Sequence, residues 1–245
     1  LLKIQDILVI TNEPSYSYFK NLLGNGSKLG IKLNYKIQKK PKGIAHAIKI
    51  SEKFINKDNV CVILGDNIFY GQSLIENIQS VTNNDKGASI FGYYMKNPNK
   101  YGVIKLNKNS NALKIVEKPR KIISNYAIPG LYFFNKDLIN YIKKIKPSKR
   151  NELEVVDVLN EYLKKGKLNV KIFGRGLAWL DTGNAESLLA ASNFIKTIED
   201  RQGIKIACIE EIALNNKWIS KMSLKRLIKD NKESVYFDYI KTLVR

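Results

Sequence analysis

Two aspartates each follow a short apolar run and open a turn. Asp66 comes after residues 59–64 and a glycine, and Asp181 comes after Trp179 and Leu180. In open α/β sheets, ligands bind beyond the carboxyl ends of the strands, where carboxylate oxygens can hold a hard cation such as Mg²⁺. Each aspartate also has a structural interpretation, Asp66 as a turn residue and Asp181 as the N-cap of a following helix. From these segments alone, both interpretations stay open.

An anion and a cation stand together at the end of another strand-like run, where Glu117 and Lys118 precede Pro119. Proline disfavours the helical conformation in the residue before it, so we expect Lys118 to be extended, with its ammonium directed toward a phosphate. Tyr101 and Gly102 begin a neighbouring run, where a glycine would let a ligand approach the backbone. A surface ion pair and a simple turn glycine are the alternative interpretations.

The sequence lacks the residues for several common chemistries. His46 is the only histidine, which excludes histidine-based triads and multi-histidine zinc sites. Walker A, dinucleotide-binding and kinase motifs do not occur. Cys61 and Cys208 stand singly in apolar runs and are interpreted as reduced core thiols. The chemistry that remains uses carboxylates, lysines and a metal ion, as phosphoryl and nucleotidyl transfer do.

Short apolar runs alternate with helical patterns along most of the chain. The alternation predicts a single α/β domain over residues 1–245 with a mostly parallel central sheet, ending in a helical tail at 204–245. The length and the 44% hydrophobic content suffice for one sizeable core. Residues 179–183 read as a turn into a long helix. We expect strands at 6–11, 33–38, 59–64, 88–95, 102–106, 112–116, 126–134 and 168–173, and helices at 15–23, 43–54, 74–81, 136–144, 152–164 and 184–201.

The formal charge of +20 raises the hypothesis of a nucleic-acid partner. Only six of the 42 basic residues are arginine, and the lysines are scattered through every segment and not gathered in one stripe with interleaved aromatic residues. We therefore expect no nucleic-acid binding, although the positive field favours small phosphorylated substrates. The sequence has no apolar stretch of membrane-spanning length and no secretory pattern at its start, so we expect no membrane partner and a cytoplasmic location.

Several segments, taken together and in order, resemble bacterial glucose-1-phosphate thymidylyltransferases of the sugar nucleotidyltransferase family. The resemblance covers essentially the whole chain, and it is specific because the motifs occur as a set. It rests on LGDNIFYG at 64–71, YGV at 101–103, VEKP at 116–119, NYA at 125–127, GLYF at 130–133, WLDTG at 179–183, NFI at 193–195, EDRQG at 199–203 and CIEEIA at 208–213.

The resemblance implies a Rossmann-like nucleotidyltransferase fold and a Mg²⁺-dependent reaction of dTTP with glucose 1-phosphate. It implies that Asp66 and Asp181 are the metal ligands, that Lys118 holds the sugar phosphate, and that these three residues are catalytic. Gln38 and Gly43 are implied as contacts to the thymine base. The sugar-phosphate pocket is implied to contain Leu64, Asn67, Tyr101, Gly102, Glu117, Lys118, Ile128 and Tyr132, with Trp179 as a wall.

The family also opens with a strand and a glycine-rich loop of the form G-G-x-G-T-R-L, whose backbone N–H groups cradle phosphates. Neither occurs in these 245 residues. We therefore expect the fold to lack its first strand and phosphate loop, and the chain as written to be inactive. The alternatives are the same fold with UTP or CTP, and a non-catalytic remnant or regulatory module that binds a sugar nucleotide. The resemblance further implies a homotetramer that supplies dTDP-glucose for deoxysugars such as rhamnose.

Overall fold

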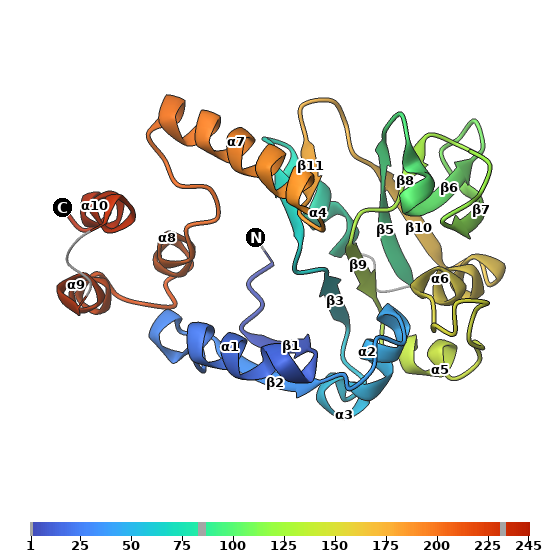
Figure 1. The fold of residues 1–245 in the computed structure, drawn as a ribbon, viewed down its shortest axis with the longest axis horizontal. Coiled ribbons are helices and arrows are strands. Elements are labelled where there is room, and N and C mark those ends of the chain that lie inside the picture. The colour runs from blue at the N-terminus through green and yellow to red at the C-terminus, as the bar shows by residue number, and fades with distance from the viewer. Residues whose placement is uncertain (1, 83–86, 231–233) are drawn as a thin grey trace. The chain divides into compact units, whose positions relative to one another are not determined.

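The computed structural model describes residues 2–82, 87–230 and 234–245. The chain divides into two compact units. The first unit contains Lys40–Asn184 with Leu2, and the second contains Lys3–Lys39 and Ala185–Arg245. The single-domain organisation stays a prediction. Figure 1 labels most of the helices and strands of both units.

The first unit is built on a seven-stranded sheet. Its strands follow the order β3-β9-β5-β8-β6-β7, and β10 pairs with β5. The apolar run at 59–64 becomes β3, as predicted, and β5 is almost entirely buried. The strands are β3 (Val60–Ile63), β5 (Ala88–Tyr94), β6 (Gly102–Leu106), β7 (Ala112–Glu117), β8 (Tyr126–Ala127), β9 (Leu131–Phe134) and β10 (Leu168–Ile172).

The α/β class is confirmed, but the expectation of mostly parallel pairing is wrong for this sheet. Only β10–β5 is parallel among the pairings of its described strands, and the others are antiparallel. Parallel neighbours need a crossover of a dozen or more residues. Five residues, 107–111, join β6 to β7, so these strands can only pair as a hairpin. The predicted strand at 126–134 is divided into β8 and β9 by residues 128–130.

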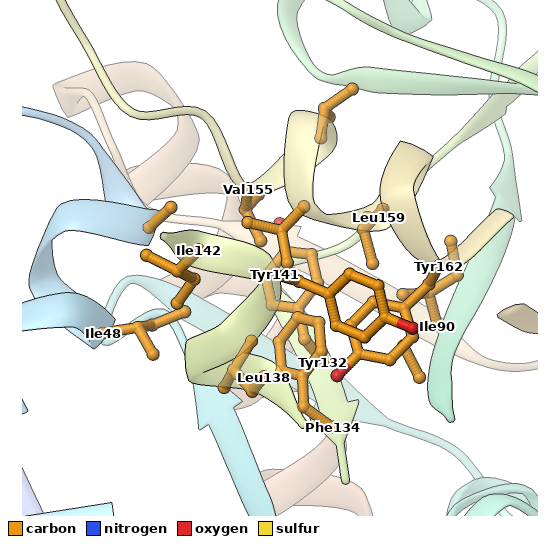
Figure 2. Close-up of a cluster of buried hydrophobic side chains, with 14 of the residues drawn as sticks. Ile48, Ile90, Tyr132, Phe134, Leu138, Tyr141, Ile142, Val155, Leu159 and Tyr162 are labelled. Atoms are coloured by element: carbon orange, nitrogen blue, oxygen red, sulfur yellow. The ribbon is translucent and has the colours of Figure 1, made fainter. Parts of the chain in front are cut away.

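Helices cover this sheet and supply much of the core. Helix α6 places Val155, Val158, Leu159 and Tyr162 on one buried face, at spacings of three and four residues. In Figure 2, side chains of α5 and α6 meet aromatic residues of β9. The predicted helix at 43–54 is divided at Ser51. The helices are α2 (Ile44–Ile50), α3 (Glu52–Ile55), α4 (Leu74–Thr82), α5 (Leu138–Ile142) and α6 (Val155–Lys164).

A two-stranded ribbon completes the first unit. Strands β4 (Asn67–Tyr70) and β11 (Ala178–Asp181) pair antiparallel, with Asp181 opposite Asn67 and Trp179 opposite Phe69. Residues 179–183 were predicted to form a turn, but β11 occupies 178–181. A four-residue strand is too short to show a clear period, and its partner is distant in the sequence. The sequence therefore carries no local pattern that predicts the ribbon.

The second unit contains a parallel pair, β1 (Asp6–Thr11) and β2 (Lys32–Ile37), connected through helix α1 (Glu13–Leu23). The side chain of Asn12 caps α1 by accepting a hydrogen bond from the backbone N–H of Ser15 at 2.9 Å. A buried cluster of Cys208, Leu224 and Ile240 holds the tail helices together. Part of the predicted tail, at 231–233, lies outside the described residues. The other helices are α7 (Ala185–Gln202), α8 (Ile209–Asn215), α9 (Lys221–Asp230) and α10 (Val235–Thr242).

Candidate active site

The ribbon brings the two predicted metal ligands together. Asp66 immediately precedes β4, and Asp181 ends β11 opposite Asn67. The backbone carbonyl of Asp66 accepts hydrogen bonds from the backbone N–H of Thr182 at 2.8 Å and from its hydroxyl at 3.0 Å. Two carboxylates that are distant in the sequence therefore lie at one end of the same ribbon.

Each carboxylate accepts one hydrogen bond from a neighbouring side chain. Asn67 Nδ2 donates to Asp66 Oδ1 at 2.6 Å, and the Tyr101 hydroxyl donates to Asp181 Oδ2 at 2.5 Å. Burial raises the pKa of Tyr101, and the hydrogen bond and charge of Asp181 and the charge of Asp66 raise it further. Tyr101 therefore remains a protonated donor at neutral pH.

The donor set fits a hard divalent cation. Asp66 is exposed and Asp181 is half-buried, so carboxylate oxygen can reach a bound ion. Within the part of the chain that the structure describes, no group of three or more His, Cys, Asp or Glu side chains could hold a metal. A cation on this pair would therefore take further ligands from substrate phosphates and water, as Mg²⁺ commonly does.

Asn67 connects this end of the ribbon to the sheet. Its Oδ1 accepts a hydrogen bond from Trp179 Nε1 at 2.6 Å and another from the backbone N–H of Gly130 at 3.0 Å. The Gly130 carbonyl accepts from the Leu64 N–H at 2.9 Å. A Cβ on Gly130 would lie 2.7 Å from the Leu64 side chain and 2.9 Å from Asn67 Oδ1, so this position has room only for glycine.

Trp179 packs against Asn67 and Tyr101. Its ring contacts Tyr101 at a centroid distance of 4.8 Å and Tyr93 at 5.4 Å, both edge-on. Only 8% of its surface is exposed. The structure thus places Trp179 in contact with two predicted pocket residues, Asn67 and Tyr101, with little of its own ring open to a ligand.

A second group of predicted residues gathers at the end of β7. Glu117 pairs with Gly102 in the β6–β7 register, and a Cβ on Gly102 would lie 3.4 Å from Glu117 Oε2. Ile128 is buried, and its N–H donates to the Gly102 carbonyl at 2.8 Å. Tyr132 is also buried; burial raises its pKa, and the charge of Glu117 adds to this effect. Gly102 and Tyr132 therefore lie near the Glu117 carboxylate, and Ile128 is bonded to Gly102 beside them.

The environment of Glu117 opposes its ionisation. Burial raises its pKa, the charges of Glu154 and Glu152 raise it further, and Lys118 and Arg150 act in the opposite direction. The net pKa lies above the ordinary glutamate value. A half-buried carboxylate in this position is suited to accept hydrogen bonds from neutral hydroxyl groups.

The backbone conformation of Lys118 differs from the predicted one. Its backbone has φ = 41°, in the left-handed region, so the expectation of an extended Lys118 before Pro119 is wrong. The N–H of Lys118 donates to the Tyr101 carbonyl at 3.0 Å, while Pro119 is buried. These two constraints fix the backbone at the end of β7 and leave the lysine side chain exposed. Strained residues of this kind are concentrated at functional sites.

Arg150 belongs to this group and was missed in the sequence. Its Nη2 lies 2.9 Å from both carboxylate oxygens of Glu154 and 3.3 Å from Glu117 Oε1. It also lies 3.5 Å from Glu152. The Glu154 side chain is only 9% exposed, and a buried carboxylate needs a cation partner. The spacing of arginine and two glutamates at 150, 152 and 154 is the signal that could have indicated the cluster.

The two residues predicted to contact the base lie in different units. Gln38 follows β2 in the second unit, and its backbone N–H donates to the Thr11 carbonyl at 2.8 Å. Gly43 precedes α2 in the first unit with φ = 91°. A Cβ on Gly43 would lie 2.4 Å from the Leu153 carbonyl oxygen. The structure therefore describes each of these residues only within its own unit.

A separate groove of about 570 Å³ lies beside α6 and β7. Its lining includes Leu113, Lys114, Lys146, Asp157 and Asn160, and none of the predicted site residues. The groove does not include Asp66 or Asp181, whose carboxylates accept hydrogen bonds from Asn67 and Tyr101 at the ribbon. We therefore take the ribbon, and not the groove, as the candidate active site.

The first unit holds the carboxylates of Asp66 and Asp181 together with Lys118 and Arg150 in an α/β fold. These features are typical of metal-assisted phosphoryl or nucleotidyl transferases. Residues 1–198 match the family described as nucleotidyl transferase. The chain is 44% identical over 245 residues to the glucose-1-phosphate thymidylyltransferase of Neisseria meningitidis, covering 100% of this chain and 85% of the relative. It is 42% identical to that of Mycolicibacterium smegmatis, covering 98% and 83%.

Solved structures agree. A Bacillus anthracis protein described as a glucose-1-phosphate thymidylyltransferase, crystallised with sucrose, superimposes with a TM-score of 0.73 at 32% identity, covering 84% of this chain and 80% of that one. A UDP-glucose pyrophosphorylase bound to UDP-glucose shares the fold, with a TM-score of 0.68 at 23% identity over 80% of this chain and 82% of that one. The chain belongs to the nucleotidyl transferase family, among the glucose-1-phosphate thymidylyltransferases.

Proposed function

We propose that the chain transfers a thymidylyl group from dTTP to glucose 1-phosphate, giving dTDP-glucose and pyrophosphate. The observation that carries the proposal is the ribbon, which sets Asp66 beside Asp181 in a chain that is 44% identical to a thymidylyltransferase. In this reaction a phosphate oxygen of glucose 1-phosphate bonds to the α-phosphorus of dTTP as the bond to pyrophosphate breaks. No proton must be removed, because the attacking oxygen is already anionic.

The main barrier is repulsion between two polyanions, and the chain offers groups that oppose it. Bound Mg²⁺ would supply charge neutralisation and orientation. Asp66 and Asp181 would hold that ion through carboxylate oxygens. The exposed Lys118 ammonium would bind the sugar phosphate, with its backbone already fixed by the bond to Tyr101. Preorganised charges of this kind lower the barrier without reorganising during the reaction.

The second group of residues would bind the sugar. Glu117 would accept hydrogen bonds from sugar hydroxyls, and Gly102 would let the ring approach the backbone beside it. Ile128 and Tyr132 would limit the pocket from the side of the core. Leu64 and Asn67 would complete it from the side of the ribbon, since Gly130 bonds to both of them. The mostly buried Trp179 would form the wall behind Asn67.

The resemblance extends the proposal to the remaining partners. Gln38 and Gly43 would contact the thymine base, and the protein would work as a homotetramer in the cytoplasm. Its product would be a precursor for the synthesis of deoxysugars such as rhamnose. In the described ranges no helix is both long and apolar enough to cross a membrane.

Pyrophosphate release from dTTP and glucose 1-phosphate tests the proposal, with dTDP-glucose identified by mass. The assay is run on the 245-residue chain and on the same chain preceded by a strand and a G-G-x-G-T-R-L loop. In the extended chain, Asp66→Asn and Asp181→Asn should each lower kcat/KM by about three orders of magnitude, the equivalent of several kcal/mol. Asp58→Asn, an exposed carboxylate on the loop before β3, is the control.

The alternatives give different results. A preference for UTP or CTP would keep the chemistry and change the nucleotide. Binding of dTDP-glucose with no pyrophosphate release by either chain would favour a regulatory module. Full activity of both asparagine variants would contradict the assignment of the site.

A further inference from the structure

The two candidate metal ligands differ from ordinary surface aspartates because each is held by one specific donor. Tyr101 approaches Asp181 only at Oδ2, and Asn67 approaches Asp66 only at Oδ1. A carboxylate has two oxygens, so a donor on one oxygen fixes the orientation of the other. Residues that hold metal ligands in this way commonly decide metal affinity.

The donors are themselves fixed by a shared partner. The Trp179 ring contacts Tyr101 at 4.8 Å, and its Nε1 donates to Asn67 Oδ1 at 2.6 Å. Asn67 must therefore present Oδ1 to the indole and to the Gly130 N–H, which leaves Nδ2 directed at Asp66. One buried indole thus orients both donors, and through them both carboxylates.

We propose that Tyr101 and Asn67 are positioning residues for the divalent metal, each holding one carboxylate oxygen so that the other faces the ion. The inference rests on the proposed function, since it assumes that Asp66 and Asp181 bind a metal. It assigns Tyr101 a role through Asp181 in addition to its predicted place in the sugar pocket. Tyr101 touches no reacting atom in this role and is not a catalytic residue for it.

Mn²⁺ binding tests the proposal without requiring turnover. The dissociation constant for Mn²⁺ is measured by water-proton relaxation in the presence of dTDP, whose diphosphate offers further oxygen ligands and which has no sugar ring to contact Tyr101 or Asn67. Tyr101→Phe removes only the hydroxyl and keeps the ring against Trp179. Loss of such a supporting hydrogen bond weakens metal affinity by about 10- to 100-fold. We expect Tyr101→Phe to weaken Mn²⁺ binding by at least about tenfold.

Tyr93→Phe is the matched control. Tyr93 contacts the same indole edge-on at 5.4 Å, so the substitution also removes one hydroxyl beside Trp179. We expect it to leave the Mn²⁺ dissociation constant unchanged. Equal weakening by both variants would indicate a general effect on the aromatic cluster and would overturn the proposal.

Asp181→Asn separates this inference from the proposed function. Weakening by Asp181→Asn and by Tyr101→Phe supports both. Weakening by Asp181→Asn with an unchanged Tyr101→Phe overturns the positioning role and leaves the metal site standing. Unchanged binding in Asp181→Asn overturns the metal site itself. Asn67→Ala removes the donor to Asp66 together with the acceptor of Trp179 and Gly130, and it should also weaken Mn²⁺ binding by about tenfold. Unchanged binding in this variant would overturn the role of Asn67.

Discussion

The indole nitrogen of Trp179 donates a hydrogen bond to the side-chain oxygen of Asn67 at 2.6 Å. Asn67 begins β4 and Trp179 lies within β11, so the bond crosses the ribbon that also carries Asp181. The same oxygen of Asn67 accepts a hydrogen bond from the Gly130 N–H, in the segment between β8 and β9. One amide side chain therefore ties the ribbon to the segment that leads into β9.

Trp179→Phe should lower the free energy of unfolding by about 1–3 kcal/mol, because Asn67 loses one of its two donors and the smaller ring leaves space. Urea denaturation followed by circular dichroism measures this change. Trp218→Phe, in the other unit, is the control for removal of an indole. An unchanged free energy in Trp179→Phe would mean that water replaces the lost donor without cost.

Lys118 gives a prediction in which stability and activity separate. A residue other than glycine in the left-handed region is strained by roughly 1–2 kcal/mol. Glycine avoids this strain, but it lowers stability by about 0.4–1 kcal/mol because it increases the conformational entropy of the unfolded chain. Lys118→Gly should therefore be more stable than Lys118→Ala by about 0.5–1 kcal/mol. Both variants lose the ammonium and should lose turnover alike. Greater stability of the alanine variant would contradict the backbone assignment.

Gly130→Ala tests the close contact between the ribbon and the sheet. The added Cβ would lie 2.7 Å from Leu64 and 2.9 Å from Asn67 Oδ1, and this overpacking should lower the free energy of unfolding by about 1–3 kcal/mol. Gly174→Ala is the matched control, since nothing lies within 4 Å of its added Cβ. The control should change stability by less than about 0.5 kcal/mol. Equal effects of the two substitutions would argue against the contact.

The raised pKa of Glu117 predicts that the stability of the protein depends on pH. Its folded pKa is raised, chiefly by burial, so the folded state binds the proton more tightly than the unfolded state does. The stability that this group contributes is therefore complete below the unfolded pKa of about 4.3 and is lost as the pH rises through the folded pKa. Glu117→Gln removes this titration. The free energy of unfolding of the variant relative to the parent should increase as the pH is raised from 4 toward neutrality.

Denaturation of both proteins across this pH range measures the difference. A constant difference would mean that Arg150 and Lys118 compensate the burial of Glu117 completely. A difference that falls with rising pH would mean that the folded pKa is lowered, contrary to the net effect of burial and of Glu154.

The sequence predicted the elements whose signal is local. The apolar run at 59–64, the hairpin strands at 102–106 and 112–116, and the long helix after Asn184 all occur at or near their expected bounds. The antiparallel sheet order was not predictable from these runs, because strand pairing depends on side-chain packing between distant segments and on loop lengths.

The candidate site divides in the same way. The resemblance pointed to Asp66, Asp181 and Lys118, but the two aspartates meet only through the pairing of β4 with β11, for which the chain carries no local pattern. The left-handed backbone of Lys118 was hidden because the Pro119 rule describes local sterics only, while the hydrogen bond to Tyr101 is a tertiary constraint.

The register of the ribbon makes the spacing of its residues as important as their identity. Successive side chains of a strand alternate between faces, so inserting a single residue between Trp179 and Asp181 would turn the carboxylate to the opposite face while the indole stayed in place. Inserting two would restore the face but move the carboxylate by about 7 Å along the strand. Changes of chain length in relatives of this protein should therefore be found outside 178–181, where they leave the distance from indole to carboxylate intact.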